Sequence, residues 1–572
     1  MKGFDGSERF ELVREIGAGG MGVVFEAVDR EQDNRVALKT MQRLRPLELY
    51  RFKQEFRSLA NIVHPNLIRL YELVSDGRDW FYTMELVDGV DFLAWVRPMP
   101  EISDVADDPT VSLRAESAAD LIDFDRLRRA FLQLVEGIHT LHRKGKLHRD
   151  IKPSNVLVRG DGRVQLLDFG LIKDLGDESE SGDRDIRDYI GSDYYMESIA
   201  TDGRVVGSIP YMAPEQAAGG TLTEACDWYA VGVILFEALT GARPFSGAAE
   251  KVLLDKQQRD PPRADELVPG LPAKFVDLCH RLLSRNPADR PTGIDLLEAL
   301  GVDRSPSNDS AEVGDLRLPF IGREHHLETL DRLYEQAASR ACMLHLHGPS
   351  GVGKSALANR FLLGLETAGE AVILAGRCYE QESVPYKALD SLVDSLSRHL
   401  LQLPTDEVRE LVPADIAALG VIFPVLERVE AVRLAPPRNI PDPFELRRVA
   451  FESLAELLRR LGERRRVVLY IDDLQWGDVD SAVFLRELIE SRFPPRLLFV
   501  ASYRSEYRDR SPCLRALPGP QTSDGERVLI DELVVGPLGR EEARSLAVTL
   551  LDEGHEAADA DRIAVESGGN PY

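Results

Sequence analysis

Short apolar runs near the N-terminus predict strands, and longer stretches with apolar residues at helical spacing predict helices. Residues 10–17 (FELVREIG) and 23–30 (VVFEAVDR) are two such short runs on either side of a glycine-rich stretch, so we expect a hairpin there. Residues 48–62 (ELYRFKQEFRSLANI) predict a helix. The apolar run WYAVGVILF at 228–236 is too short to span a bilayer and predicts a buried helix.

A second pattern begins beyond residue 340. The apolar run MLHLHG at 343–348 predicts a strand, a glycine-rich loop follows it, and residues 355–362 predict a helix. Two further apolar runs, at 465–471 and 496–503, predict buried strands. Strands that alternate with helices imply an α/β domain with a parallel sheet, and ligands bind at the carboxyl ends of such strands.

The two patterns are separated by the segment GVDRSPSNDSAEVGD at 301–315, which is rich in Ser, Asp, Gly and Pro and lacks apolar periodicity. This is the composition of a linker. We therefore expect a first domain at 1–300, a linker at 301–317 and a second domain at 318–572.

Composition and charge exclude several classes of protein. A hydrophobic content of 44% over 572 residues is that of a globular chain, and a net charge of -26 argues against general nucleic-acid binding. The five cysteines lie far apart without metal-ligand spacing and predict reduced thiols. The first ten residues lack the apolar stretch of a secretory signal. We therefore expect a cytoplasmic protein without a membrane or nucleic-acid partner.

The loop of the first hairpin carries Gly17, Gly19 and Gly22 in the spacing G-x-G-x-x-G. Glycines let the backbone close over phosphates because no Cβ stands in the way. This spacing alone is weak evidence, since dinucleotide-binding folds share it, but there it joins a strand to a helix. Strands on both sides of the loop favour a lid over a nucleotide instead.

Further motifs follow in a fixed order: RVALKTM with Lys39, LHRDIKPSNVL with Asp150, LLDFGL with Asp168, YMAPEQ at 211–216, CDWYAVG with Asp227 and NPADRPT with Arg290. This set resembles the eukaryotic-like (Hanks-type) serine/threonine protein kinases of bacteria. The resemblance covers roughly residues 10 to 300. It implies an α+β bilobal protein kinase fold, with an N-lobe at about 10–87 and a C-lobe at about 88–300.

The resemblance implies a role for each residue that the chemistry needs. Lys39 would hold the α and β phosphates of ATP, with Glu55 as its ion-pair partner and Glu48 as the alternative. Asp150 would accept or orient the proton of the substrate hydroxyl, and Lys152 would stabilise the transferring phosphoryl group and favour Ser/Thr over Tyr as acceptor.

The cofactors expected in this domain are ATP and Mg²⁺. Asn155 and Asp168 would hold the metal. Met84 would stand at the back of the adenine pocket, with the backbone of Glu85 and Val87 at the adenine edge. The full set of residues expected to bind ATP is Ile16, Gly17, Gly19, Gly22, Val24, Ala37, Lys39, Met84, Glu85 and Val87. Asp227 and Arg290 match buried pair-forming positions of the C-lobe.

The segment from Asp168 to Glu215 spans 48 residues and is long for an activation segment. Ser198 and Thr201 are its candidate phosphorylation sites. Arg149 precedes the catalytic Asp150, so a cation is present with which a phosphate would pair. We therefore expect self-phosphorylation in addition to phosphorylation of protein substrates.

Three other features of the first domain concern its loops. The acidic segments 100–120 and 174–188 predict solvated insertions. Ser208 stands where the family usually has Thr, and its hydroxyl retains the ability to bond to Asp150.

The second domain opens on a phosphate-binding loop. Gly348, Gly353, Lys354 and Ser355 match G-x-x-x-x-G-K-S, with Gly351 between them. Backbone N–H groups and the N-terminus of the following helix suit a polyphosphate. In such a loop the lysine reaches the β and γ phosphates and the serine binds magnesium. The strand before and the helix after make this a strong match.

Partners for this loop lie downstream. The strand YIDD ends in Asp472, which would hold magnesium through water, and Asp473, which would orient or activate the attacking water. Arg504 would sense the γ phosphate. Residues 318–572 are similar to the signal-transduction ATPases with numerous domains, the STAND class of AAA-related proteins. The resemblance places Arg323 in the entry motif of such modules and Pro537 where they contact adenine. That resemblance implies a slow nucleotide switch, possible oligomerisation, and a further region beyond "GGNPY".

Three hypotheses follow. The leading one is a serine/threonine protein kinase with a second ATP-binding module that acts as a regulatory switch. The others are a nucleotide-driven signalling scaffold, or a transcription regulator, in which the kinase fold is mainly regulatory. The intact catalytic residues favour the first over the second.

Overall fold

The computed structural model describes residues 4, 6–19, 22–41, 45–75, 79–98, 122–168, 173–174, 209–302, 320–438, 440–491, 494–520, 527–551 and 557–571. They form two compact units, and the main division along the chain falls between Asp309 and Ser310. No helix among the described residues combines the length and the apolar character needed to cross a bilayer. All five cysteines lie in these residues, buried and without disulfides.

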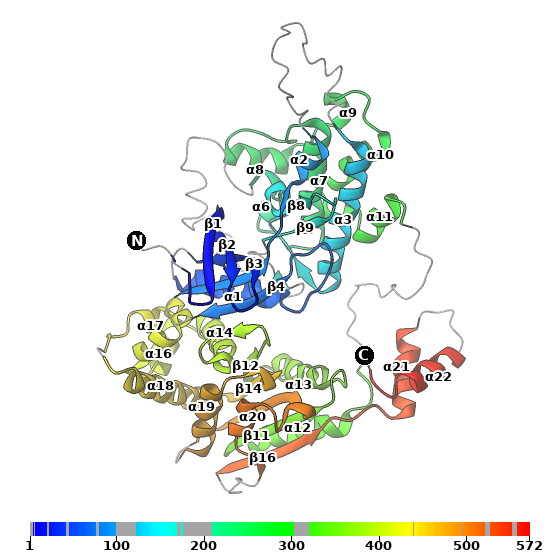
Figure 1. Ribbon diagram of the computed structural model, residues 1–572. Helices are drawn as coiled ribbons and strands as arrows, with labels where there is room; N and C mark the ends of the chain where they lie inside the picture. The colour runs from blue at the N-terminus through cyan, green and yellow to red at the C-terminus, as the bar shows by residue number, and fades with distance from the viewer. Residues whose placement is uncertain are drawn as a thin grey trace. The chain divides into compact units, whose positions relative to one another are not determined.

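The first unit begins with a sheet whose strands lie in the order β1-β2-β3-β5-β4. Its strands are β1 (Phe10–Gly19), β2 (Gly22–Asp29), β3 (Asn34–Thr40), β4 (Leu70–Ser75) and β5 (Trp80–Glu85). Strands β1 and β2 form the predicted antiparallel hairpin, and helix α1 (Pro46–Leu59) follows β3, as shown in blue in Figure 1. This sheet carries the glycine-rich loop and the lysine strand.

The rest of the first unit is mainly helical and packs around α7 (Ala225–Thr240). Almost every residue of α7 is buried, which explains its all-round apolar sequence. The other helices are α2 (Phe92–Val96), α3 (Phe124–Arg143), α6 (Pro214–Ala217), α8 (Ala249–Gln258), α9 (Ala264–Leu267), α10 (Ala273–Leu282) and α11 (Gly293–Ala299).

Short elements at the edge of these helices carry the catalytic motifs. Strands β6 (Gly89–Asp91), β8 (Val156–Arg159) and β9 (Val164–Leu166) form one small sheet, and β7 (Lys146–Leu147) pairs with β10 (Lys173–Asp174). The 3₁₀ turns are η2 (Pro153–Asn155), η4 (Ile209–Tyr211) and η5 (Pro287–Asp289).

The second unit is built on a parallel sheet with the strand order β12-β14-β15-β11-β16. Its strands are β11 (Ala341–Gly348), β12 (Ala371–Arg377), β14 (Arg466–Asp472), β15 (Leu497–Arg504) and β16 (Val528–Val534). Gly348 pairs in register with Arg504, and Arg377 pairs with Asp472. The carboxyl ends of neighbouring strands are therefore level, which places the predicted phosphate-binding motifs on one edge.

Helices cover this sheet, and Figure 1 labels them in chain order. The larger helices are α12 (Glu324–Gln336), α13 (Lys354–Ala368), α14 (Lys387–Gln402), α18 (Pro443–Arg464), α19 (Val479–Glu490), α21 (Arg540–Leu550) and α22 (Ala557–Glu566). The shorter elements are β13 (Glu382–Ser383), α15 (Thr405–Leu411), α16 (Ile416–Ile422), η6 (Pro424–Arg428), α17 (Glu430–Arg433), η7 (Leu474–Trp476), η8 (Ser505–Tyr507) and α20 (Pro512–Ala516).

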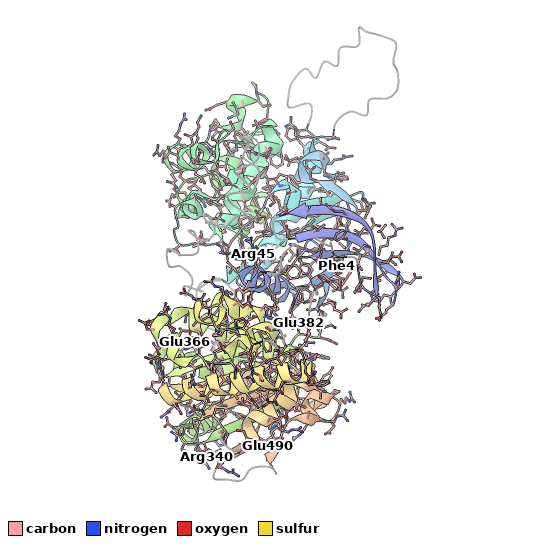
Figure 2. All side chains as sticks on the ribbon, turned by 90° about the vertical axis from the view of Figure 1, so that its left-hand side faces the viewer. Phe4, Arg45, Arg340, Glu366, Glu382 and Glu490 are labelled. Carbon is pink, nitrogen blue, oxygen red and sulfur yellow. The ribbon has the colours of Figure 1, made fainter. Side chains whose placement is uncertain are left out.

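The strands of this sheet are all parallel, so their carboxyl ends share one edge. Figure 2 labels Arg340, just before β11, and Glu490, the last residue of α19, both in the lower part of the view.

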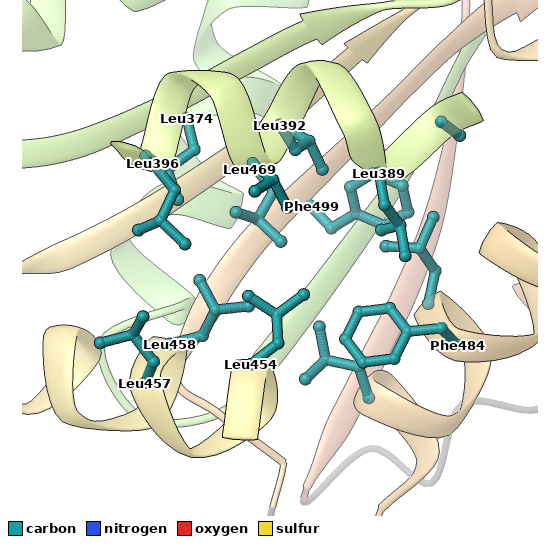
Figure 3. Close-up of a cluster of buried hydrophobic side chains, with 14 of the residues drawn as sticks. Leu374, Leu389, Leu392, Leu396, Leu454, Leu457, Leu458, Leu469, Phe484 and Phe499 are labelled. Carbon is teal, nitrogen blue, oxygen red and sulfur yellow. The ribbon is translucent and has the colours of Figure 1, made fainter. Parts of the chain in front are cut away.

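An aliphatic cluster between α14, α18 and the sheet forms the core of the second unit, and its side chains point towards one another in Figure 3. Leu389 and Leu396 of α14 meet Leu454 and Leu458 of α18 over Leu469 of β14. Their burial contributes to the hydrophobic stabilisation that holds these helices on the sheet.

We predict that Leu396→Ala lowers the free energy of unfolding of the second unit by about 2–5 kcal/mol, because it removes buried contacts and leaves a cavity. Leu396 is 1% exposed. Leu401, on the same helix and 38% exposed, is the matched control, and Leu401→Ala should cost less than about 1 kcal/mol. Calorimetric melting of the full chain measures both, and equal shifts for the two variants would contradict this packing.

Candidate active site

The first unit brings Lys39 of β3 against Glu55 of α1. Lys39 Nζ donates to Glu55 Oε1 at 2.8 Å and also bonds to Asp168 Oδ1. Tyr82 of β5 donates its hydroxyl to the same Glu55 oxygen at 2.6 Å. The partner of Lys39 is thus Glu55 and not the alternative Glu48, and one buried network joins four separate elements.

Burial and charge together set the ionisation of this network. Burial lowers the pKa of Lys39, but Asp168 and Glu55 outweigh it, so that its pKa lies well above the ordinary value. Lys39 lowers the pKa of Asp168 to about 2. Burial raises the pKa of Glu55, whose Oε2 is buried without a hydrogen-bond partner in the described residues. The site therefore holds a fixed cation between two carboxyl groups.

The predicted ATP-binding residues of the sheet lie around this cation. Val24 of β2 is the direct cross-strand partner of Lys39 and also pairs with Gly17 of β1. A Cβ on Gly22 would lie 2.1 Å from the carbonyl oxygen of Thr40, so the chain passes too closely there for any other residue. The register alone therefore puts the glycine-rich loop next to the lysine.

The remaining nucleotide-binding candidates occupy the strands on either side. Ile16 and Gly19 lie on β1, Ala37 is buried on β3, and Met84 and Glu85 end β5, with Val87 just beyond it. Glu85 directs its carboxylate to Arg159. Its backbone N–H donates to the carbonyl oxygen of Arg69 at 2.9 Å, and the adenine contact expected of its backbone stays a prediction.

The catalytic loop gathers Asp150, Lys152 and Asn155. Lys152 Nζ donates to Asp150 Oδ2 at 2.7 Å. Asn155 Nδ2 donates to the carbonyl oxygen of Asp150 at 2.9 Å and to its Oδ2 at 3.2 Å. The Asn155 amide is thus oriented with its nitrogen towards Asp150. Its oxygen is the end that suits a metal ion, and Asp168 is the carboxylate that would share the metal.

The buried carboxylate of Asp227 on α7 binds the backbone of the catalytic loop. Asp227 accepts the backbone N–H groups of His148 and Arg149 at 2.9 and 2.8 Å, and His142 Nε2 lies 2.8 Å away. Although burial raises the pKa of Asp227, these donors lower it more. Arg149 has a positive φ of 67°, a strained conformation that such anchoring sustains.

Arg290 makes a separate buried pair. Its guanidinium bonds to both carboxylate oxygens of Glu215, at 2.6 and 2.9 Å, and to the carbonyl oxygens of Ala225 and Ser284 at 2.8 Å. Asp227 and Arg290 are therefore both buried and paired, as their motifs predicted, but with different partners.

Several predictions fall outside the described residues. These are the phosphorylation candidates Ser198 and Thr201, the family departure at Ser208, the acidic segment 100–120 and most of 174–188, and the linker. They stay predictions.

The second unit places its phosphate-binding loop between β11 and α13. Gly351 and Gly353 have positive φ angles of 79° and 96°, which glycine alone adopts at little cost. Lys354 Nζ donates to the carbonyl oxygens of Gly348 and Pro349 at 3.0 and 2.8 Å. Burial lowers the pKa of Lys354, and Asp472 and Asp473 oppose that shift. The ammonium of Lys354 thus bonds to the backbone of its own loop, where a phosphate would replace these carbonyl oxygens as its partner.

The residues expected at magnesium and water lie at the carboxyl end of β14. Ser355 Oγ donates to Asp472 Oδ2 at 2.9 Å, so the hydroxyl and carboxylate that would share a metal already meet. Asp473 accepts from Arg377 at 2.6 Å and from Gln475 Nε2 at 2.9 Å. Gln475 Oε1 in turn accepts the backbone N–H of Arg504 at 3.2 Å. Asp473 and Arg504 are thereby linked.

The remaining candidates of the second unit surround the same loop. Arg323 donates to the carbonyl oxygens of Val352 at 3.2 Å and of Gly536 at 2.6 Å. The backbone N–H of Leu538, next to Pro537, donates to Gly569 at 2.8 Å. The GGNP segment thus packs against the position where adenine contact is expected.

Comparison with known proteins identifies the two domains that carry these candidate sites. The model of the protein kinase domain matches residues 10–300, and the model of the AAA ATPase domain matches residues 319–500. The chain belongs to the protein kinase family. The serine/threonine-protein kinase PknL of Mycobacterium tuberculosis is 30% identical to this kinase over 318 residues, which cover 54% of this chain and 68% of the relative.

Other relatives are also bacterial serine/threonine-protein kinases. PrkC of Bacillus subtilis is 29% identical over 297 residues, 51% of this chain and 40% of the relative. PknA of Mycobacterium tuberculosis is 31% identical over 292 residues, 50% of this chain and 58% of the relative. The kinase thus shares about half of its length with each of them. It is a protein serine/threonine kinase that also carries an AAA ATPase domain.

Sequence reasoning missed several residues that complete the two sites. Tyr82 binds Glu55, and Arg377 and Gln475 bind Asp473. Tyr82 and Gln475 lie close to the predicted site residues Met84 and Asp473, and Arg377 is the last residue of β12. Proximity to a motif was the available signal, because the contacts themselves depend on the fold.

We predict that Asp150→Ala abolishes phosphate transfer to protein but leaves ATP affinity nearly unchanged. Asp150 acts on the acceptor hydroxyl, whereas Lys39 and Asp168 face the nucleotide. Transfer should fall at least about 10²-fold, the low end of a general base contribution. Labelled ATP measures transfer and a nucleotide-binding assay measures affinity.

The exposed Asp161 of the same unit supplies the control, and Asp161→Ala should retain transfer. Loss of ATP binding in Asp150→Ala would contradict the division between the acceptor-facing and nucleotide-facing groups.

Proposed function

We propose that this kinase transfers the γ-phosphate of ATP to serine and threonine hydroxyls of proteins, itself included. We further propose that its second unit is a STAND-type nucleotide switch that regulates the transfer in signal transduction. The observation that carries the first part is the buried bond of Lys39 to Glu55 and Asp168. It is the arrangement that phosphoryl transfer requires of a kinase.

The residues divide the work of transfer between nucleotide and acceptor. Lys39, held by Glu55, would bind the α and β phosphates, and magnesium held by Asn155 and Asp168 would neutralise charge on the phosphates. Asp150 would take the proton of the acceptor hydroxyl. Lys152 lies 2.7 Å from Asp150 and is placed to offset the charge of the group in transfer.

The resemblance of the second unit to STAND-type modules carries the proposal of a slow nucleotide switch. Lys354 and Ser355 are the groups that would meet the phosphates and magnesium. Asp473, which accepts from Arg377 and Gln475, is the carboxylate that would orient the water. Oligomerisation through this unit is part of the same proposal.

Arg149 supports regulation by phosphorylation of the activation segment. Its Nε is buried without a hydrogen-bond partner in the described residues, and an unpartnered guanidinium nitrogen is costly. A phosphate would supply the missing acceptor.

We predict that the active kinase phosphorylates itself within residues 174–208, at Ser198 or Thr201. A phosphate carries about -1.5 to -2 charges and orders a loop when a cation such as Arg149 is near. Phosphopeptide mapping of wild type, with Asp150→Ala as the inactive control, measures this. Sites found only elsewhere in active protein would refute it.

We predict that Lys354→Ala abolishes nucleotide binding in the second unit and changes the kinase rate by about 5- to 150-fold, since allosteric coupling amounts to about 1–3 kcal/mol. The ATP affinity of the Lys39 site should stay unchanged, because no residue is shared. The rate is measured with myelin basic protein as acceptor.

Arg360→Ala is the control for this experiment, since Arg360 lies exposed on the same helix, α13. Equal kinase rates in wild type and Lys354→Ala would argue against a switch within this chain. Absence of transfer in wild type, with ATP bound, would favour a signalling scaffold instead.

A further inference from the structure

Lys256 of α8 is a buried lysine whose bonds all go to one short segment. It is 0% exposed. Its Nζ donates to the carbonyl oxygens of Ile209 at 2.9 Å, Pro210 at 2.6 Å and Met212 at 2.6 Å. Three N–H donors thus match three backbone acceptors, of which the carbonyl oxygen of Ile209 also accepts from the N–H of Met212 at 3.3 Å.

The ammonium of Lys256 has no carboxylate partner among the described residues, where its other neighbour is the ring of Tyr229, 5.3 Å away. Burial lowers the pKa of Lys256 well below its ordinary value, and Arg243 adds to that shift. An apolar side chain of similar length would avoid this desolvation cost but would remove the donor to three carbonyl oxygens. The energy of the buried ammonium is therefore tied to the position of this one segment.

The segment that Lys256 holds lies beside the catalytic loop. Tyr211 and Met212 line a small cavity together with Arg149 and Asp150. Gln216, just after the segment, donates to the carbonyl oxygen of Arg149 at 3.2 Å. The segment therefore forms one wall of the space next to the residue that faces the acceptor hydroxyl.

Two further contacts fix the same segment. Ile209 packs with Phe245 and Val252 in an apolar cluster, and Tyr211 donates its hydroxyl to Glu237 at 2.6 Å. Helices α6 and α8 lie side by side (Figure 1), and α8 also contacts the 3₁₀ turn η4 of this segment. Lys256 is the contact that binds the backbone itself, so it sets where the peptide groups of residues 209–212 lie.

We propose that Lys256 is a positioning residue for the protein acceptor: it holds the backbone of residues 209–212 so that this wall of the site receives the acceptor chain next to Asp150. This inference rests on the proposed kinase function. It assigns Lys256 no contact with ATP and no part in the chemical step.

The test is steady-state kinetics of the full-length chain with myelin basic protein as acceptor, in wild type and Lys256→Met. Methionine keeps the length of the side chain and removes all three donors. We expect kcat/KM for myelin basic protein to fall by roughly 10²-fold, as small misplacements of a reactant produce, mainly through a raised KM. The KM for ATP should stay unchanged. Lys251→Met, an exposed lysine of the same helix, should behave as wild type.

Each outcome decides between the alternatives. An unchanged KM for myelin basic protein in folded Lys256→Met overturns the inference, and so does a parallel rise in both KM values, which indicates a merely structural role. If Lys256→Met does not fold, Tyr211→Phe, which loosens the same segment from Glu237, must raise the acceptor KM alone, and its failure to do so also overturns the inference. Absence of transfer in wild type would instead refute the proposed function.

Discussion

The buried ammonium of Lys39 is the group on which the kinase site depends. It is 5% exposed and is neutralised by carboxyl groups from two other elements, Glu55 on α1 and Asp168 after β9. Loss of Glu55 would leave the buried ammonium with Asp168 alone, whose side chain is 47% exposed, and would weaken the compensation of the buried charge. The sheet, the helix and the metal-binding residue are therefore coupled, because the position of each is favourable only when the others are in place.

The candidate phosphate site of the second unit is built mainly from the backbone. Its parallel register places Gly348, Asp472 and Arg504 on one edge, and the N-terminus of α13 faces the same edge. Burial lowers the pKa of Lys354, against the nearby carboxylates Asp472 and Asp473, whereas Asp168 and Glu55 raise the pKa of Lys39. The two lysines therefore have opposite electrostatic settings.

The sequence predicted what local motifs carry and missed what the fold brings together. The hairpin, the lysine strand and the parallel sheet follow from apolar periodicity. The choice of Glu55 over Glu48 follows from its separation from Lys39 in the sequence. Arg377 is different, since it lies 96 residues from the Asp473 that it binds. No local pattern marks such a pair, because it depends on β12 lying next to β14.

Buried charges in the helical part of the kinase act on loops that helix packing alone would leave free. Asp227 of α7 accepts backbone N–H groups of the catalytic loop, and Arg290 donates to Glu215. Lys256 of α8 donates to backbone carbonyl oxygens of residues 209–212. Hydrophobic contacts are non-directional and tolerate small displacements, whereas hydrogen bonds to a charged group fix distance and angle. Burying these charges costs desolvation free energy, and in return it fixes the geometry of the loops. These are loops whose geometry catalysis needs.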